Sequence, residues 1–89
     1  MEKLKIEVTE KREIEIELPY YSRYFNSYYA VITPDGCIKV NVNDLSIIRL
    51  PVVCVCGEGN EKCDKSEFDI AYLQVTEKLN KLCNYIEKL

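Results

Sequence analysis

The sequence contains no histidine among its 89 residues. Histidine is the commonest general base in enzymes and a frequent metal ligand, so its absence excludes Ser-His and Cys-His nucleophile pairs and every metal site that includes an imidazole. A phosphate-binding loop is also missing, because Gly57-Glu-Gly59 is not followed by the Gly, Lys and Ser or Thr that such a loop requires. We therefore expect that the protein is not an enzyme.

The chain also lacks an excess of positive charge and a long apolar run. Twelve Lys and Arg residues and 15 Asp and Glu residues give a formal net charge of −3, which does not suit a nucleic-acid backbone. No segment approaches the roughly 18 apolar residues that cross a bilayer, and the charged residues 1–6 are unlike a signal peptide. We expect one cytoplasmic domain, residues 1–89, with no nucleic-acid or membrane partner, and the composition suggests a bacterial or phage source.

Apolar and charged residues alternate over residues 4–18, with the period of a half-buried strand. The apolar positions are all even-numbered: Leu4, Ile6, Val8, Ile14, Ile16 and Leu18. Residues 9–12 contain no Gly, Pro, Asn or Asp to build a tight turn, so we predict one long strand, bent near Glu10. Part of such a strand would be unpaired, and pairing with a second copy would give a homodimer through this strand.

The polar face of this segment carries a row of three glutamates, Glu13, Glu15 and Glu17. The row could bind cations or a basic partner. A solvated face that discourages aggregation is the simpler interpretation, because antiparallel sheets commonly have one charged face. A catalytic acid pair is not expected, since all three carboxylates would share one environment.

Six aromatic residues fall within positions 20–29: Tyr20, Tyr21, Tyr24, Phe25, Tyr28 and Tyr29. Tyrosine combines a rigid apolar face with a polar tip, so this segment, with Arg23, could recognise a protein or stack on nucleotide bases. The alternative is that these rings fill a core that contains no Trp, and we expect at least Phe25 and Tyr28 to be buried. The predicted partner-binding surface combines part of this cluster with the glutamate row: Tyr20, Tyr21, Arg23, Tyr24, Tyr29, Glu13, Glu15 and Glu17.

A β-hairpin is predicted around Thr33-Pro-Asp-Gly36, because these residues suit a type I turn with a bulge. Placing Thr33 opposite Cys37 puts Cys37 on the outer face and three residue pairs on the core face. These pairs are Ile32/Ile38, Ala30/Val40 and Tyr28/Val42. A fourth strand is expected from Ile47 to Cys56, with Pro51 forcing an edge, a bulge or a bend.

The last quarter of the chain, residues 66–89, predicts an amphipathic helix with Ser66 and Asp69 in an approximate capping box. Its apolar stripe consists of Phe68, Ala71, Val75, Leu79, Leu82, Ile86 and Leu89. The stripe could also pair with a copy of itself as a short coiled coil, but Lys78 interrupts the heptad register, and Tyr72, Leu73 and Cys83 broaden the apolar arc, so packing on the sheet is preferred. The predicted fold is α+β: an antiparallel four-stranded meander sheet, its first strand long and bent, with one C-terminal helix packed across one face.

The five cysteines are an odd number, so reduced thiols are expected. Four of them could bind zinc: Cys37, Cys54, Cys56 and Cys63. The motif is weak because C-x-C-x(6)-C is not the usual pair of knuckles, and buried, metal-free cysteines are the simpler interpretation. Cys83 would lie about 25 Å along the helix from its start, too far to share an ion with Cys63.

These observations favour a small non-enzymatic protein-interaction module, such as an adaptor, an inhibitor or an accessory subunit. No cofactor is expected for it. The alternatives are a cysteine-ligated zinc module and a thiol enzyme that uses Cys54 or Cys56.

Overall fold

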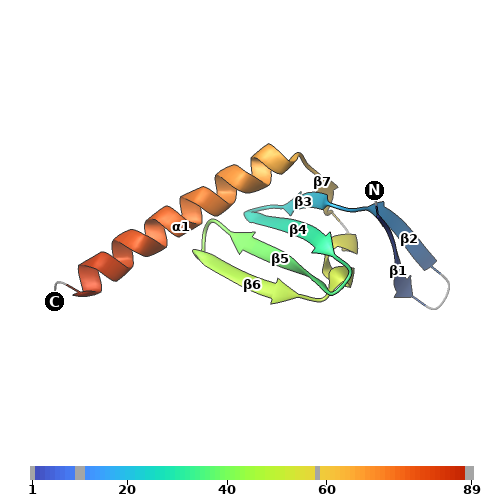
Figure 1. Cartoon of the computed structure of the whole chain (residues 1–89), viewed down its shortest axis with the longest axis horizontal. Coiled ribbons are helices and arrows are strands. Elements are labelled where there is room, and N and C mark those ends of the chain that lie inside the picture. The colour runs from blue at the N-terminus through green and yellow to red at the C-terminus, as the bar shows by residue number, and fades with distance from the viewer. Residues whose placement is uncertain (1, 10–11, 58, 88–89) are drawn as a thin grey trace.

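The structure, a computed structural model, describes residues 2–9, 12–57 and 59–87. It contains a five-stranded antiparallel sheet, a two-stranded hairpin, a short 3-10 helix and a C-terminal α-helix packed on the larger sheet, so the predicted α+β class is confirmed (Figure 1). The elements are β1 Lys3–Thr9, β2 Arg12–Glu17, β3 Tyr20–Tyr24, β4 Ser27–Thr33, β5 Gly36–Asn41, β6 Ser46–Leu50, the 3-10 helix Val52–Cys56, β7 Glu61–Lys62 and α1 Lys65–Glu87. Within the described ranges, no helix is long and apolar enough to cross a membrane.

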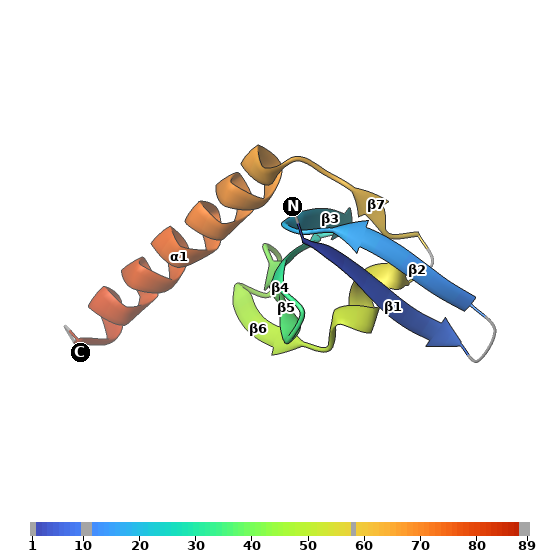
Figure 2. The same ribbon diagram turned by 45° about the vertical axis from the view of Figure 1, so that its right-hand side comes forward.

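The five-stranded sheet, in the order β6-β5-β4-β3-β7, has a cover on each face. The helix α1 packs on one face, and the β1–β2 hairpin with the 3-10 helix packs on the other (Figure 2). The helix-side core consists of Tyr21, Ala30, Val40, Cys63, Phe68, Ala71 and Val75. The hairpin-side core consists of Ile6, Ile16, Leu18, Tyr29, Val31, Cys37 and Val55. The central strands therefore alternate between two apolar cores.

The prediction of one long first strand is wrong, because β1 and β2 pair antiparallel as a hairpin. Leu4 pairs with Ile16 and Ile6 with Ile14, so even-numbered residues meet even-numbered residues on one face. The alternation in the sequence is the same for a continuous strand and for this hairpin, which is why the pattern could not distinguish them. The predicted bend near Glu10 lies outside the described residues. A homodimer through the first strand stays a prediction. The long unpaired overhang on which it depended is not observed, because β1 pairs with β2 along its length.

The register predicted for the β4–β5 hairpin is also wrong. Thr33 pairs with Gly36 rather than Cys37, and the register shifts between Ala30 and Thr33, so Ala30 lies opposite Ile38. Cys37 points into the hairpin-side core and is only 1% exposed. It was expected to face outward because the β1–β2 hairpin, which covers this face, was not anticipated.

Two further strand predictions need correction, in number and in length. Tyr20–Tyr24 is itself a strand, β3, and the short β7 pairs with it, so the larger sheet has five strands rather than four. The strand expected from Ile47 to Cys56 ends at Leu50. The strand ends there because the next residue, Pro51, has no N–H to donate to a sheet ladder. The Pro51 carbonyl instead accepts the Cys54 N–H as the chain enters the 3-10 helix.

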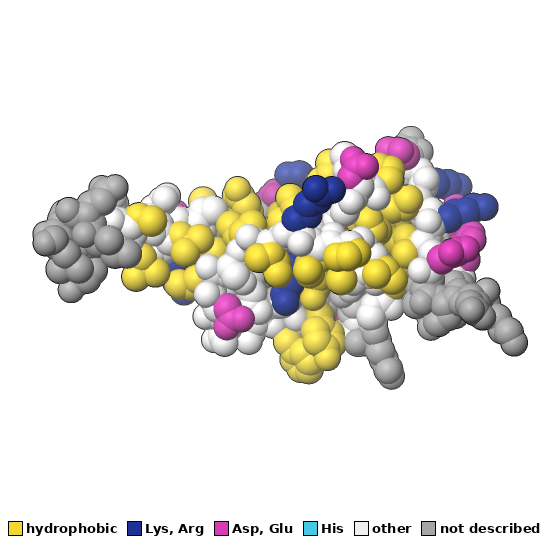
Figure 3. All heavy atoms as spheres, turned by 90° about the horizontal axis from the view of Figure 1, so that it is seen from below, with side chains coloured by type: hydrophobic (Ala, Val, Ile, Leu, Met, Phe, Trp, Pro, Cys, Tyr) yellow, Lys and Arg dark blue, Asp and Glu magenta, His cyan; other side chains and the backbone are white. Residues whose placement is uncertain are grey.

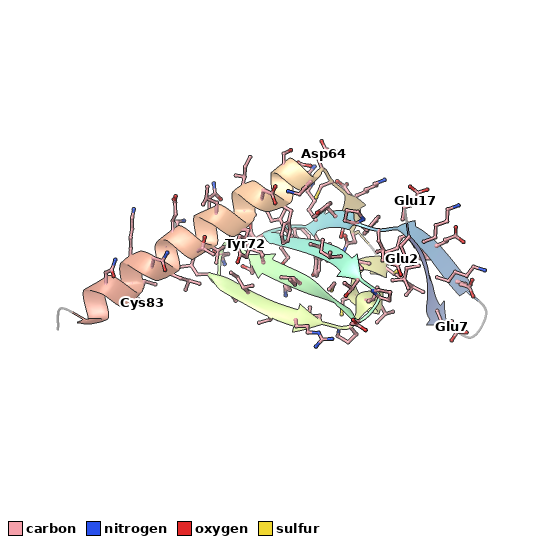
Figure 4. All side chains as sticks on the ribbon, in the orientation of Figure 1. Glu2, Glu7, Glu17, Asp64, Tyr72 and Cys83 are labelled. Atoms are coloured by element: carbon pink, nitrogen blue, oxygen red, sulfur yellow. The ribbon has the colours of Figure 1, made fainter. Side chains whose placement is uncertain are left out.

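The helix α1 begins one residue earlier than predicted, and its last described residue is Glu87. Its cap lies two residues before the expected one: the Asp64 N–H donates to Glu67 Oε2 at 3.0 Å, and the Glu67 N–H donates to the Asp64 carbonyl at 3.1 Å. Figure 4 shows Asp64 at this end of the helix and Cys83 near the other end. Only the first half of α1 is covered by the sheet, since Leu82 is 50% exposed.

Candidate interaction surface

The turn between β3 and β4 exposes the most prominent aromatic side chain of the described residues. Tyr24 pairs with Ser27, so the turn consists of Phe25 and Asn26 alone. Phe25 has a φ of 51° and is 84% exposed. A tight turn of this kind favours glycine where φ is positive, and a bulky residue there carries a backbone cost of about 1–2 kcal/mol. The prediction that Phe25 is buried is therefore wrong, because no Gly or Pro in the sequence marked this turn.

The ring of Phe25 meets the ring of Tyr24 edge to face, with centroids 4.5 Å apart and planes at 75°. Tyr24 is in turn held by the loop before β7. Gly59 has a φ of 85°, and a Cβ placed there would lie 2.8 Å from Tyr24 Cε2, so glycine is required for both its backbone and its contact. We call Tyr24 and Phe25 the aromatic tip.

The base of the aromatic tip is tied to the neighbouring elements. The Asn26 carbonyl accepts the Val42 N–H at 3.0 Å, and this bond fixes the turn against the segment that follows β5. Arg23 forms ion pairs with Glu61 on β7 at 3.6 Å and with Glu67 on α1 at 3.3 Å. The arrangement holds the exposed ring of Phe25 and the partly covered ring of Tyr24 on a scaffold of sheet and helix.

A shallow recess of about 370 Å³ adjoins the aromatic tip. It is lined by Arg23, Tyr24, Phe25, Tyr28, Gly59 and Glu61. Tyr28 itself is partly buried and packs against the helix-side core. The surface thus combines apolar rings with a charged rim, which is the usual composition of a protein-binding patch.

The predicted partner-binding tyrosines do not form one surface. Tyr21 is buried in the helix-side core, where its ring lies 5.7 Å from that of Phe68, and Tyr29 is buried in the hairpin-side core. Tyr20 lies at the other end of β3 from the aromatic tip and lines a separate recess of about 630 Å³ with Ile14 and Asn60. Of the predicted residues, only Arg23 and Tyr24 line the recess beside the aromatic tip. Their role in binding a partner stays a prediction.

The glutamate row lies on the outer face of the β1–β2 hairpin and is partly neutralised by lysines of the opposite strand. Lys3 lies 3.8 Å from Glu15, and Lys5 lies 3.9 Å from Glu13, while Glu17 pairs with Lys3 in the strand register. All these side chains are solvent-exposed, so each ion pair contributes little to stability. Figure 4 shows Glu17 on this hairpin. The row lies on β2, whereas the aromatic tip lies in the turn between β3 and β4, and none of the three glutamates lines the recess beside the tip.

The four cysteines of the predicted zinc set are divided between the two cores. Cys37 belongs to the hairpin-side core, and Cys54 and Cys56 pack against it, whereas Cys63 is buried in the helix-side core. Among the described residues, no group of three or more Cys, Asp or Glu side chains is arranged to hold a metal ion. All five cysteines are thiols rather than disulfides. A zinc site stays a prediction that this arrangement does not favour.

The buried thiols are poorly suited to nucleophilic chemistry. The Cys37 thiol donates a hydrogen bond to the Pro51 carbonyl at 3.6 Å. Burial, and secondarily the charge of Cys54, raises the pKa of Cys37 from 9.0 to about 11. Burial also raises the pKa of Cys63. A raised pKa lowers the thiolate fraction at neutral pH, which makes a thiol less reactive.

The surface includes three residues that were not predicted to belong to it: Phe25, Gly59 and Glu61. The residues around Phe25 do not indicate that it lies in an exposed turn, because this turn is defined by the pairing of β3 with β4. Comparison with protein-family models, with curated proteins and with solved structures found no match to this chain. The site is accordingly defined by its own geometry: a constrained and exposed pair of aromatic rings above a charged rim.

Proposed function

We propose that this chain is a protein-binding module whose aromatic tip inserts into an apolar pocket of a partner protein. The observation that carries the proposal is the exposure of Phe25 at 84% in a left-handed conformation. Both features cost free energy in the isolated protein, and such costs concentrate at functional sites. Insertion of the ring into a partner would recover the burial that the fold does not provide.

The surroundings of Phe25 match those of an interface anchor. Aromatic and arginine side chains are enriched among the residues that dominate binding energy, and polar neighbours exclude water around them. Tyr24 supplies a second ring beside Phe25, and Arg23 with Glu61 supplies a charged rim. Loss of a central anchor ring typically costs 2 kcal/mol or more, or roughly 30-fold in affinity.

Affinity capture at low salt from the native host tests this function. The tagged bait is the full chain, as wild type, as Phe25→Ala and as Leu73→Ala. Leu73 is also exposed, at 57%, but it lies on α1 and does not line the recess beside the aromatic tip, so its variant controls for general loss of apolar surface. We expect a protein that is captured by wild type and by Leu73→Ala and is lost with Phe25→Ala. Capture of the same proteins by all three baits would contradict the proposal.

A further inference from the structure

The strand β6 forms one border of the larger sheet, and its outer edge carries no further strand. All of its residues pair with β5, and Figure 1 shows β6 at the lower border of the sheet. Within the part of the chain that the structure describes, no backbone group outside β5 hydrogen-bonds to β6. The outward N–H and C=O groups of every second residue are therefore available to pair with another strand.

The two faces of β6 differ in chemistry. Ile47 packs against the helix-side core and Leu50 against the hairpin-side core, so strand alternation places Arg49 on the helix side and Ile48 on the hairpin side. Ile48 is 44% exposed. Figure 3 views the molecule from the side that β6 borders and shows hydrophobic side chains exposed across it. A strand added to β6 would therefore meet an apolar neighbour on its hairpin side.

Basic side chains flank β6 on its helix side. Arg49 is exposed toward one end of the strand. Lys78 and Lys81 of α1 line an apolar recess of about 410 Å³ at the other end, where the preceding turn enters β6. The described acidic residues in the turns at these two ends are Asp35 and Asp44, so the three cations are in excess. The helix side of this edge thus favours an acidic neighbour.

We propose that β6 binds an extended segment of a partner protein by strand addition, and that this segment alternates acidic with apolar residues. Its side chains on the helix side meet Arg49, Lys78 and Lys81, and those on the hairpin side meet Ile48. Backbone pairing supplies the affinity, and the alternating side chains supply the specificity. No residue of β6 lines the recess beside the aromatic tip, so this inference does not depend on the function proposed above.

A second copy of β6 fits this edge less well than an acidic segment does. Antiparallel pairing about a two-fold axis sets one residue opposite itself, and the register that pairs the whole strand is centred on Ile48. Arg49 of both copies then lies on the same face, each opposite Ile47 of the other copy, and β6 contains no acidic residue to compensate them. An acidic strand removes this repulsion and replaces it with attraction.

A synthetic strand tests this chemistry on the full chain labelled with nitrogen-15. The probe is a capped peptide of about seven residues that alternates Glu with Val. We expect it to bind at low salt with a Kd on the order of 0.1–1 mM and to shift the amide resonances of β6 most strongly. One control peptide has Lys in place of Glu, and the other has the acidic sequence with N-methylated peptide bonds, which cannot pair as a strand. Both controls should bind at least roughly tenfold more weakly.

Two matched charge reversals locate the contact. Arg49→Glu introduces a negative charge on β6, and Lys62→Glu makes the same change on β7, at the opposite border of the sheet. Both side chains are exposed, and circular dichroism checks that both variants fold. We expect Arg49→Glu to weaken binding of the acidic peptide at least roughly fivefold and Lys62→Glu to weaken it less than about twofold.

Three results would overturn the inference. The first is no binding of the acidic peptide at about 2 mM, or equal binding of either control peptide. The second is equal affinity of Arg49→Glu and Lys62→Glu for the acidic peptide. The third is movement of the β6 amide resonances with protein concentration alone, which would identify a second copy as the occupant of this edge.

Discussion

The chain has two phenylalanines in opposite environments, and replacing each by alanine tests the proposed division between scaffold and binding surface. Phe68 is 8% exposed in the helix-side core, beside Tyr21 and Val75. Deleting a buried phenylalanine ring typically costs about 3–5 kcal/mol, as lost burial plus a cavity. For 89 residues the total stability is on the order of 4–13 kcal/mol, so Phe68→Ala should remove a large share of it.

Phe25→Ala should behave differently because most of its ring is already in water. With less than a fifth of the side chain covered, the lost burial amounts to about 0.5 kcal/mol. Alanine keeps the same left-handed backbone cost, so that contribution is unchanged. Phe25 is expected to matter for binding and hardly at all for folding.

Urea denaturation followed by circular dichroism measures both variants. With a denaturant slope of about 1–3 kcal/mol per molar, Phe68→Ala should lower the midpoint by at least ~1 M or leave the protein unfolded in buffer, and Phe25→Ala should lower it by less than ~0.5 M. A loss of more than ~2 kcal/mol with Phe25→Ala would mean that the ring is part of the core, contrary to its high exposure.

Three further predictions follow from contacts within the fold. Gly59→Ala should destabilise the protein by about 1–2 kcal/mol and move Tyr24, because residue 59 has a positive φ and a Cβ there would lie 2.8 Å from the Tyr24 ring. Thermal unfolding and tyrosine fluorescence measure these effects, and an unchanged melting temperature would contradict the prediction. Glu67→Gln should lower the free energy of unfolding by about 1 kcal/mol, because it weakens the cap at the Asp64 N–H and the ion pair with Arg23. Urea denaturation measures this loss, and a loss no larger than that of Glu77→Gln, an exposed control on the same helix, would argue against the cap. Because burial raises the pKa of Cys37 from 9.0 to about 11, the folded state retains a proton that the unfolded chain releases as the pH rises. The contribution of this thiol to the free energy of unfolding is complete below pH 9 and falls by about 2–3 kcal/mol between pH 9 and 11. Cys37→Ala should lack this part of the pH dependence, and identical pH profiles for the variant and the wild type would exclude it.

The α+β class could be predicted from the sequence because the helix and the alternating strands have strong periodic signals. The order of pairing in the first 18 residues could not. Leu4 and Ile16 share a face whether the segment is continuous or folded back, and the residues that decide between these two structures carry no turn signature. Cys37 was consequently expected to be exposed, since the hairpin that covers its face of the sheet was unknown.

The candidate site was predictable only as a region. Aromatic density drew attention to residues 20–29, but density does not distinguish the buried Tyr21 and Tyr29 from the exposed Phe25. That distinction depends on strand alternation and on a turn whose strained residue carries no sequence signal. Gly59 joins the surface from a loop 34 residues after Phe25, through a contact that exists only in the folded chain.

Site-specific photo-crosslinking in the native host shows whether a protein partner contacts the aromatic tip. A benzophenone amino acid replaces Phe25 in one variant and Leu73 in another, so that both probes occupy exposed apolar positions. We expect a discrete crosslinked protein from position 25 and none of the same mass from position 73. Absence of an adduct at position 25, or the same adduct from both positions, would contradict it.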